Sequence, residues 1–250
     1  MTLPDVIILY GAPASGKGTQ ADNLKQYLHR YNYTHFDFGG ELRKFVTLHL
    51  GKYKDLSETE ITSFPNPDNN LDITNAIEAG TKMLRGEVVA PDTVWYIMSK
   101  QIADALESGE RLIVEGLGRT FEDARRFGKI AKSKKLKVCI FHLCITMQES
   151  VKRSVTRFYV NGHSKPYSSL KDALENCTNG ERPWQRPEDL DSNTVARRYN
   201  NMYAEIYAKV LSILQMDCKA DLFIIDGRDS IEDDFKRIRE YLLTFYQINE

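Results

Sequence analysis

The chain has 250 residues, of which 42% are hydrophobic and 28% are charged, and its formal net charge at pH 7 is −1. A chain of this length can bury a sizeable core, in one domain with insertions or in two small domains. The balanced charge gives no indication of binding to nucleic acid or to a membrane surface. The sequence also lacks a signal-peptide pattern and any apolar run of the roughly 18 residues that span a bilayer. Its four cysteines form no C-x-x-C pair, so we expect a cytoplasmic protein with reduced thiols.

Short apolar runs alternate along the chain with stretches of helical periodicity. We expect strands at residues 6–10, 33–36, 111–115, 137–144 and 222–225, and helices at 19–31, 42–50, 91–107, 120–133, 147–159, 187–215 and 231–245. Continuous rather than alternating apolar strands are typical of parallel sheets that are buried on both faces. The order therefore predicts an α/β fold, a doubly wound parallel sheet of five strands flanked by helices. Ligands of such sheets bind beyond the carboxyl ends of the strands.

Two segments interrupt this alternation. Residues 50–86 and 160–186 are polar, rich in turn-forming residues and weakly patterned. Long excursions of this kind inside a compact domain are usually functional lids or loops. Among the histidines, His142 stands inside an apolar strand, where we expect a hydrogen-bonded core residue, whereas His35 has the better claim to lie near a site.

The loop after the first predicted strand carries the phosphate-loop pattern G-x-x-x-x-G-K. It consists of Gly11, Ala12, Pro13, Ala14, Ser15, Gly16, Lys17, Gly18 and Thr19. Its glycines let successive backbone N–H groups point into one concavity, and the dipole of the following helix favours an anion there. Lys17 can lie along the β- and γ-phosphates of a nucleotide, and Thr19 or Ser15 can place a hydroxyl near Mg²⁺. The general pattern has Ser or Thr directly after the lysine, whereas here Gly18 intervenes.

The form G-x-P-x-S-G-K-G-T-Q resembles the loop of adenylate kinases and related nucleoside monophosphate kinases. Two later motifs resemble the same family in the same order. HFDFGGELR at residues 35–43 is similar to H-x-S-T-G-D-x-L-R, with Phe38 in the threonine place and Gly40 in the aspartate place. EGLGRT at residues 115–120 is similar to D-G-F-P-R-T, with glutamate for aspartate and Gly118 for proline.

The resemblance implies a role for the arginines of these motifs. Arg43 and Arg119 would bind the phosphate of the monophosphate, and Glu115 would orient water bound to Mg²⁺. Further matches, in VKRSVTR, RPED and TVARRY, imply that Arg153, Arg157, Arg186 and Arg198 close over the triphosphate and the transferring phosphoryl group. The implied catalytic residues are therefore Lys17, Arg119, Arg153, Arg157, Arg186 and Arg198. The implied monophosphate site comprises Phe38, Gly39, Arg43, Val89, Gly116, Arg119 and Asp123, and the implied metal site comprises Thr19 and, through water, Glu115.

The motifs leave open which base the acceptor nucleotide carries. Adenylate kinases read adenine with a glutamine four residues after the arginine of D-G-F-P-R, and that place is held here by Asp123. An ionised carboxylate only accepts hydrogen bonds, so it suits guanine or cytosine better than adenine. Phe38 adds a ring that could stack on a base. In the alternative, Asp123 faces solvent and Glu122 or backbone groups read the base.

The resemblance covers roughly residues 5–45, 86–158 and 186–245. It implies a core kinase domain at residues 1–37, 87–158 and 187–250, a monophosphate-binding insertion at 38–86 and a lid at 159–186. It further implies a monomeric kinase that uses Mg²⁺, ATP and a monophosphate, AMP first, with GMP, CMP or UMP as alternatives. Two other possibilities are a nucleotide-binding regulatory module that has lost phosphoryl transfer and a phosphate-loop hydrolase.

Overall fold

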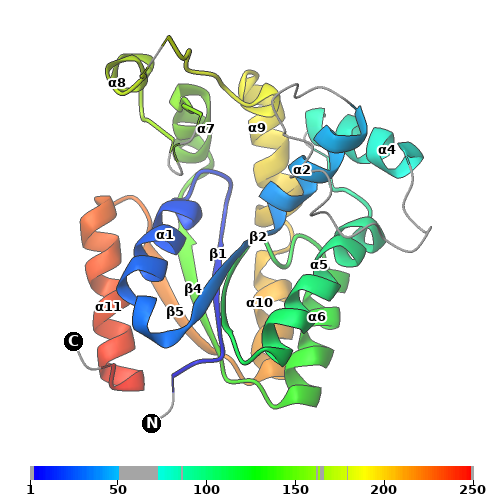
Figure 1. Cartoon of the computed structure of the whole chain (residues 1–250), viewed down its shortest axis with the longest axis vertical. Helices are drawn as coiled ribbons and strands as arrows, with labels where there is room; N and C mark the ends of the chain where they lie inside the picture. Colours follow the sequence, from blue (N-terminus) through cyan, green and yellow to red (C-terminus); the bar gives the residue numbers. More distant parts are fainter. Residues whose placement is uncertain are drawn as a thin grey trace.

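A five-stranded sheet, with its strands all parallel, forms the centre of the molecule in the computed structural model (Figure 1). The structure describes residues 3–50, 73–85, 87–161, 163, 166–178 and 180–248. The strands are β1 (Val6–Gly11), β2 (Tyr33–Asp37), β3 (Arg111–Glu115), β4 (Val138–Cys144) and β5 (Asp221–Asp226), in the spatial order β2-β3-β1-β4-β5. Each lies within one residue of its predicted bounds. The predicted α/β fold is confirmed.

The central strand β1 divides the core into two layers. Because side chains alternate between the faces of a strand, Val6, Ile8 and Tyr10 belong to one apolar cluster while Ile7 and Leu9 belong to the other. The four residues from Val6 to Leu9 have no solvent-accessible surface. Burial on both faces explains why the strand is apolar throughout.

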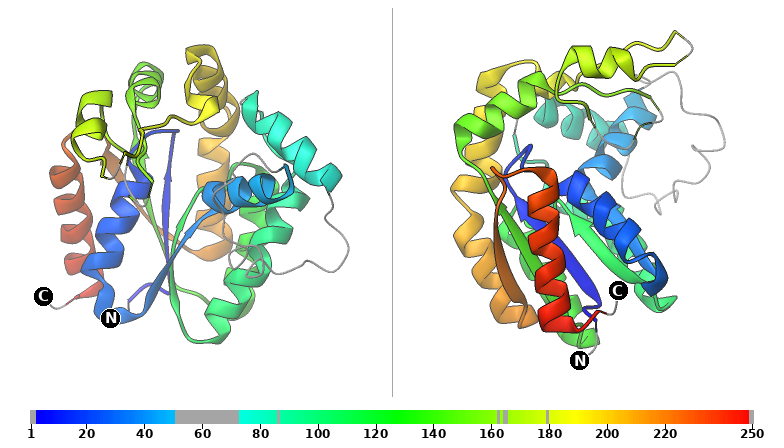
Figure 2. Two further views of the ribbon diagram at one scale, coloured as in Figure 1. Left: turned by 45° about the horizontal axis from the view of Figure 1, so that its top comes forward. Right: turned by 90° about the vertical axis from the view of Figure 1, so that its left-hand side faces the viewer.

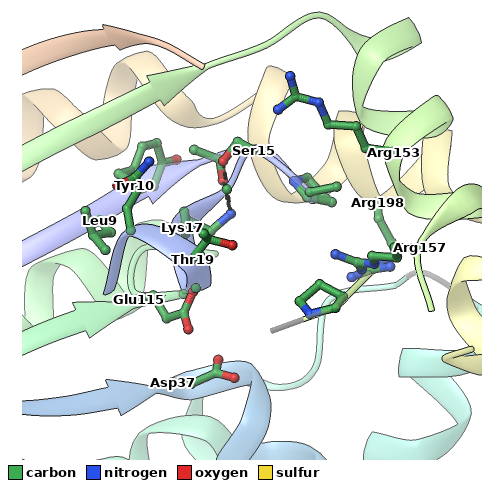
Figure 3. A pocket seen from close by; sticks show the side chains of 18 of the residues that line it. Leu9, Tyr10, Ser15, Lys17, Thr19, Asp37, Glu115, Arg153, Arg157 and Arg198 are labelled. Atoms are coloured by element: carbon green, nitrogen blue, oxygen red, sulfur yellow. Dashed lines mark hydrogen bonds between the residues drawn. The ribbon is translucent and has the colours of Figure 1, made fainter. Parts of the chain in front are cut away.

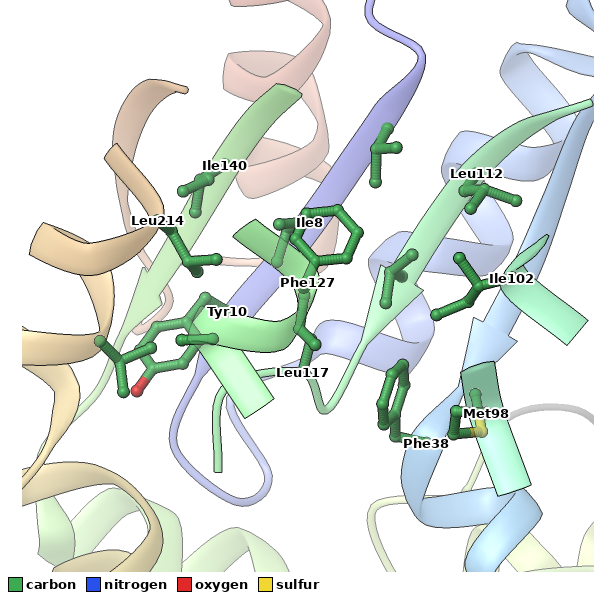
Figure 4. Packing of buried hydrophobic residues seen from close by; sticks show 14 of the residues in the cluster. Ile8, Tyr10, Phe38, Met98, Ile102, Leu112, Leu117, Phe127, Ile140 and Leu214 are labelled. Carbon is green, nitrogen blue, oxygen red and sulfur yellow. The ribbon is translucent and has the colours of Figure 1, made fainter. Parts of the chain in front are cut away.

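Helices cover both faces of the sheet (Figures 1 and 2). One face carries α5 (Pro91–Glu107), α6 (Phe121–Lys134) and α10 (Tyr207–Cys218), and the other carries α1 (Lys17–Tyr27) and α11 (Ile231–Tyr246). Figure 4 shows the first face, where Phe127 of α6 and Leu214 of α10 pack near Ile8. Within the described part of the chain, no helix is long and apolar enough to cross a membrane.

The remaining helices lie beyond the carboxyl ends of the strands (Figure 1). They are α2 (Phe38–Leu50), α4 (Ile73–Leu84), α7 (Met147–Thr156), α8 (Leu170–Glu175) and α9 (Ser192–Tyr199). Antiparallel bridges pair Phe158 with Tyr167 and Tyr159 with Trp184, so the segment between α7 and α9 folds back on itself. This arrangement surrounds the edge of the sheet where ligands of α/β proteins bind.

The helix expected at residues 19–31 ends at Tyr27, and the one expected at 42–50 begins at Phe38. Two later predicted helices differ more. The helix expected at residues 147–159 ends at Thr156, because the next residues are extended and form the antiparallel bridges. The single helix expected at 187–215 is instead a short turn, η2 (Pro187–Asp189), followed by α9, a π-helical segment, η3 (Asn200–Ala204), and α10. The helices α4 and α8 were not predicted, since both lie in the weakly patterned segments.

Candidate active site

A cavity of about 440 Å³ opens at the carboxyl edge of the sheet, beside the loop between β1 and α1 (Figure 3). Every cationic side chain that the sequence analysis assigned to phosphate lines it: Lys17, Arg43, Arg119, Arg153, Arg157, Arg186 and Arg198. These residues come from five separate stretches of the chain, around residues 17, 43, 119, 153–157 and 186–198. The fold therefore brings cations from motifs up to 181 residues apart (Lys17 to Arg198) to the wall of one cavity.

The loop between β1 and α1 curls tightly at two glycines with positive φ, Gly11 (φ 153°) and Gly16 (φ 94°). A side chain at position 11 would collide with the carbonyl oxygen of Leu143 on β4, so the close packing of the loop requires glycine there. The helix α1 begins directly at Lys17 and has no acidic residue in its first turn. Its positive end is therefore left free to attract an anion.

The ammonium group of Lys17 folds back onto this loop. Its Nζ donates hydrogen bonds to the backbone oxygens of Ala12, at 2.6 Å, and Gly11, at 3.0 Å. Burial lowers the pKa of Lys17 to about 8, and the neighbouring Glu115 opposes this shift. A desolvated cation at the mouth of a phosphate loop is poised to exchange backbone partners for phosphate oxygens.

Two carboxylates end the neighbouring strands β2 and β3. Asp37 and Glu115 are register partners, and both line the cavity across from Lys17 (Figure 3). The Nε2 atom of His35 lies 3.2 Å from Oε1 of Glu115, and this contact raises the pKa of His35 although burial acts in the opposite direction. His35 therefore lies at the site, as its position in the sequence predicted, where it orients a carboxylate.

The carboxylate of Asp37 occupies the space above Gly40. Its Oδ1 accepts a hydrogen bond from the backbone N–H of Gly39 at 2.9 Å, and its Oδ2 pairs with Nη2 of Arg43 at 3.4 Å. Although burial raises the pKa of Asp37, the charge of Arg43 and the backbone donors outweigh it and lower the pKa. A Cβ atom at position 40 would lie 2.5 Å from Oδ2. The acidic group missing at Gly40 is thus supplied from three residues earlier.

Asp189, which is fully buried in η2, holds two of the arginines. Its Oδ2 pairs with Arg157 at 2.7 Å, and its Oδ1 accepts from Nη1 of Arg198 at 2.9 Å. One carboxylate thus fixes the end of α7 relative to α9. Sequence reasoning assigned Asp189 no role, although the residue is part of the RPED motif.

An aromatic pair supports a third arginine. Tyr159 stacks on Trp184 with ring centroids 4.9 Å apart, and the Cζ atom of Arg186 lies 4.5 Å from the centroid of Tyr159. Burial lowers the pKa of Arg186 to about 10, and its buried Nε has no hydrogen-bond partner among the described residues. The pattern of charges in the sequence gave no signal for Tyr159.

Arg153 lies apart from this group. Its Nε donates to Oε1 of Glu149 at 2.7 Å, and Figure 3 shows it well separated from Arg157, on the far side of Lys17 from Asp37. The resemblance to the kinases implies that Arg153 and Arg157 close over the same phosphates. The structure instead turns Arg153 toward a different part of the cavity.

Four members of the expected monophosphate site are not among the cavity-lining residues: Phe38, Gly39, Val89 and Asp123. Val89 is buried, and Phe38 packs in the apolar core near Met98, so the Phe38 ring is not available to stack on a base (Figure 4). Asp123 is only 2% exposed, which contradicts the alternative that it faces solvent. It caps α6, since its Oδ2 accepts from the backbone N–H of Thr120 at 3.1 Å.

Asp123 retains one free acceptor. Its Oδ1 is buried and has no hydrogen-bond partner among the described residues, and burial raises the pKa of Asp123 to about 6. The other members, Arg43, Gly116 and Arg119, line the cavity. Gly39 lies beside them, since a Cβ atom there would be 2.6 Å from Nη2 of Arg119. Of the phosphate loop, Ala12 alone is buried beneath the cavity rather than lining it.

The loop that carries Arg119 is built around Gly118. Its φ of 78° is closed to proline, and a Cβ atom there would lie 2.6 Å from Cγ1 of Val210 on α10. The glycine that replaces the proline of D-G-F-P-R-T therefore reflects a different local backbone. Arg119 reaches the cavity nonetheless.

The oxygen atoms of the site fit Mg²⁺. The hydroxyl of Thr19 and the carboxylates of Asp37 and Glu115 line the cavity, and Mg²⁺ prefers such oxygen ligands. No group of three or more His, Cys, Asp or Glu side chains within the described residues could hold a metal ion alone. The remaining ligands would be phosphate oxygens and water, as is usual for Mg²⁺.

Comparisons with known proteins point to one kind of enzyme. The chain is 25% identical to an adenylate kinase of Chlamydia pneumoniae over 85% of this chain and 86% of that protein. It is 24% identical to an adenylate kinase of Petrotoga mobilis over 96% and 98% of the two chains, and 25% identical to one of Flavobacterium psychrophilum over 94% and 97%. No protein-family model matches the chain. These similarities support a relationship with the kinases at a distant level.

Proposed function

We propose that the protein is a nucleoside monophosphate kinase that transfers the γ-phosphoryl group of ATP to a monophosphate, with AMP as the first candidate. The observation that carries the proposal is the convergence of Lys17 and six arginines on one cavity beside a phosphate loop. Phosphoryl transfer needs positioning and positive charge rather than a nucleophilic side chain. A protein that only binds a nucleotide has no need for so many half-buried cations.

The cations divide between donor and acceptor. The loop from Gly11 to Thr19 holds the phosphates of ATP, and Lys17 follows the charge that develops between the β- and γ-phosphates. Arg43 and Arg119, which lie on the side of Asp37, bind the phosphate of the acceptor. Arg157 and Arg198, held by Asp189, stabilise the charge on the phosphoryl group in flight.

Mg²⁺ is the proposed cofactor. Thr19, Glu115 and Asp37 would hold the ion directly or through water, and the ion would neutralise charge on the phosphates. The protein's own contribution is to orient these oxygens. His35 fixes the carboxylate of Glu115, and the backbone of Gly39 fixes that of Asp37.

Exclusion of water separates a kinase from a hydrolase. We propose that residues 159–186 act as a lid and residues 38–86 as the monophosphate-binding insertion, on a core of residues 1–37, 87–158 and 187–250. In the first of these segments Tyr159 and Arg186 face the cavity, and Trp184 stacks on Tyr159. Closure over the substrates would keep water from the γ-phosphate.

Asp123 is buried and does not line the cavity, so we propose that its free Oδ1 contacts the acceptor base only once the bound nucleotide has opened access to it. The ionised group suits guanine or cytosine, whereas the protonated group, which a pKa of about 6 makes accessible, can also donate to a ring nitrogen of adenine. The test is kcat/KM for AMP, GMP, CMP and UMP in wild type and Asp123→Gln. If AMP leads about a hundredfold and the substitution changes nothing, Asp123 does not read the base.

A further inference from the structure

One carboxyl oxygen in the cavity wall, Oδ1 of Asp234, is buried and has no hydrogen-bond partner among the described residues. Asp234, on the first turns of α11, is 4% exposed and lines the cavity together with Ile231 and Arg153. A buried polar atom without a partner is costly, so a position that keeps one calls for an explanation.

The other acidic residues of this turn are accounted for. Asp233 accepts a hydrogen bond from the hydroxyl of Ser230, the residue that caps α11, and Glu232 is exposed. Asp229 pairs with Arg237. Asp234 alone combines burial, a free acceptor and a place in the cavity wall.

The direction of phosphoryl transfer indicates which part of the donor nucleotide lies near Asp234. The acceptor phosphate belongs with Arg43 and Arg119, next to Asp37, and in-line transfer requires the donor to leave the phosphate loop on the opposite side. Figure 3 shows Arg153 on that opposite side of Lys17. The part of the cavity between Arg153, Ile231 and Asp234 is therefore where the base of the donor nucleotide extends.

We propose that Asp234 determines donor specificity by accepting a hydrogen bond from the exocyclic amino group of a purine base. This inference rests on the proposed kinase function. The apolar side chain of Ile231 and the planar guanidinium of Arg153 suit the faces of a base, while Asp234 reads its edge. Burial and the charge of Asp229 raise the pKa of Asp234 to about 6, while Arg237 and Arg153 oppose the shift. The group is thus mainly an ionised acceptor at pH 7.5.

Two matched pairs of donors test the proposal. ATP differs from purine riboside triphosphate by the 6-amino group, and GTP differs from ITP by the 2-amino group. We expect wild type to prefer the amino-bearing member of one pair by at least about tenfold in kcat/KM, the usual effect of a hydrogen bond to a charged group. Asp234→Leu should reduce that ratio below about threefold, and Asp234→Asn, which keeps an acceptor oxygen, should give an intermediate ratio.

The control is Glu232→Gln, which removes a charge from the same helical turn outside the cavity and should leave the ratio unchanged. Calorimetric binding of the non-hydrolysable β,γ-methylene forms of the four nucleotides repeats the comparison without turnover. Discrimination in binding that depends on Asp234, in a protein without transfer, would retain this inference and reject the kinase. Equal losses for all four donors in Asp234→Leu, or no preference in wild type, would overturn the inference whether or not the kinase is active.

Discussion

Burial of the Lys17 ammonium group, which the proposed function requires, lowers the free energy of unfolding. Its pKa in the folded protein is about 8, against an ordinary value of 10.5. The unfolded chain therefore binds more protons than the folded one between these values, and the free energy of unfolding rises with pH across that window. Below pH 8 the fold carries the full cost of a desolvated cation.

Replacing Lys17 by methionine should therefore raise the melting temperature Tm at pH 7. The gain should shrink as the pH rises toward about 10, because wild-type Lys17 is neutral there. The same variant should lose more than about tenfold in kcat, since the charge acts in the transition state. Thermal unfolding at both pH values and steady-state kinetics check this. A variant that is less stable than wild type at pH 7, or a Tm difference independent of pH, would contradict the burial argument.

The arginines should separate by the step they serve. Arg43→Ala should chiefly raise KM for the monophosphate, because the residue lies beside Asp37 on the acceptor side. Arg157→Ala or Arg198→Ala should mainly lower kcat, by about a hundredfold, as expected for contacts made in the transition state. Initial rates with each substrate varied in turn distinguish the two. An Arg43→Ala variant that weakens only ATP would show that the acceptor side is wrongly assigned.

Among the elements, the strands could be predicted from the sequence, whereas the break of the segment 187–215 into η2, α9, η3 and α10 could not. Buried parallel strands are continuous apolar runs, which is why all five were predicted within one residue. The break between α9 and α10 has no such signal. It depends on the π-helical segment Asn200–Ala204, which places Tyr203 so that its hydroxyl lies 2.9 Å from Nε2 of the core residue His142. That contact arises only from tertiary packing.

The junction of α7 with α9 depends on Asp189. Asp189→Ala should leave Arg157 and Arg198 without a partner in a buried setting and lower the free energy of unfolding by about 3–5 kcal/mol. It should also lower kcat, because both arginines lose their orientation. Urea unfolding and kinetics provide the readouts, with Asp191→Ala, which removes the exposed cap of α9, as a milder comparison at about 1 kcal/mol. Equal effects of the two substitutions would argue against the junction.

The backbone of the loop between β3 and α6 can be tested by restoring the proline of the family motif. Gly118→Pro restores the residue found in D-G-F-P-R-T, yet it should destabilise this protein by more than about 2 kcal/mol, since the φ of 78° and the contact with Val210 both forbid it. Urea unfolding measures the change. A neutral or stabilising effect would mean that the loop has the backbone expected from the family motif.

At the scale of the whole molecule, the site lies where the strand ends meet the segment between α7 and α9. The cations could be predicted because their motifs are local and ordered along the chain. Asp37 and Asp189 were missed because their roles depend on which arginine lies opposite, and Phe38 was misjudged because its position in a motif does not reveal that its ring turns into the core. Local sequence patterns identify the charged groups, whereas their partners are set by the fold.

Separation of the nucleotides after incubation with MgATP and each monophosphate tests the central claim most directly. We predict that diphosphate forms from both substrates at equal rates, with little free phosphate, since transfer to the acceptor replaces transfer to water. Release of phosphate without diphosphate from the acceptor would identify a hydrolase. Binding of ATP without any turnover would identify a nucleotide-binding module, and either result would contradict the proposed kinase.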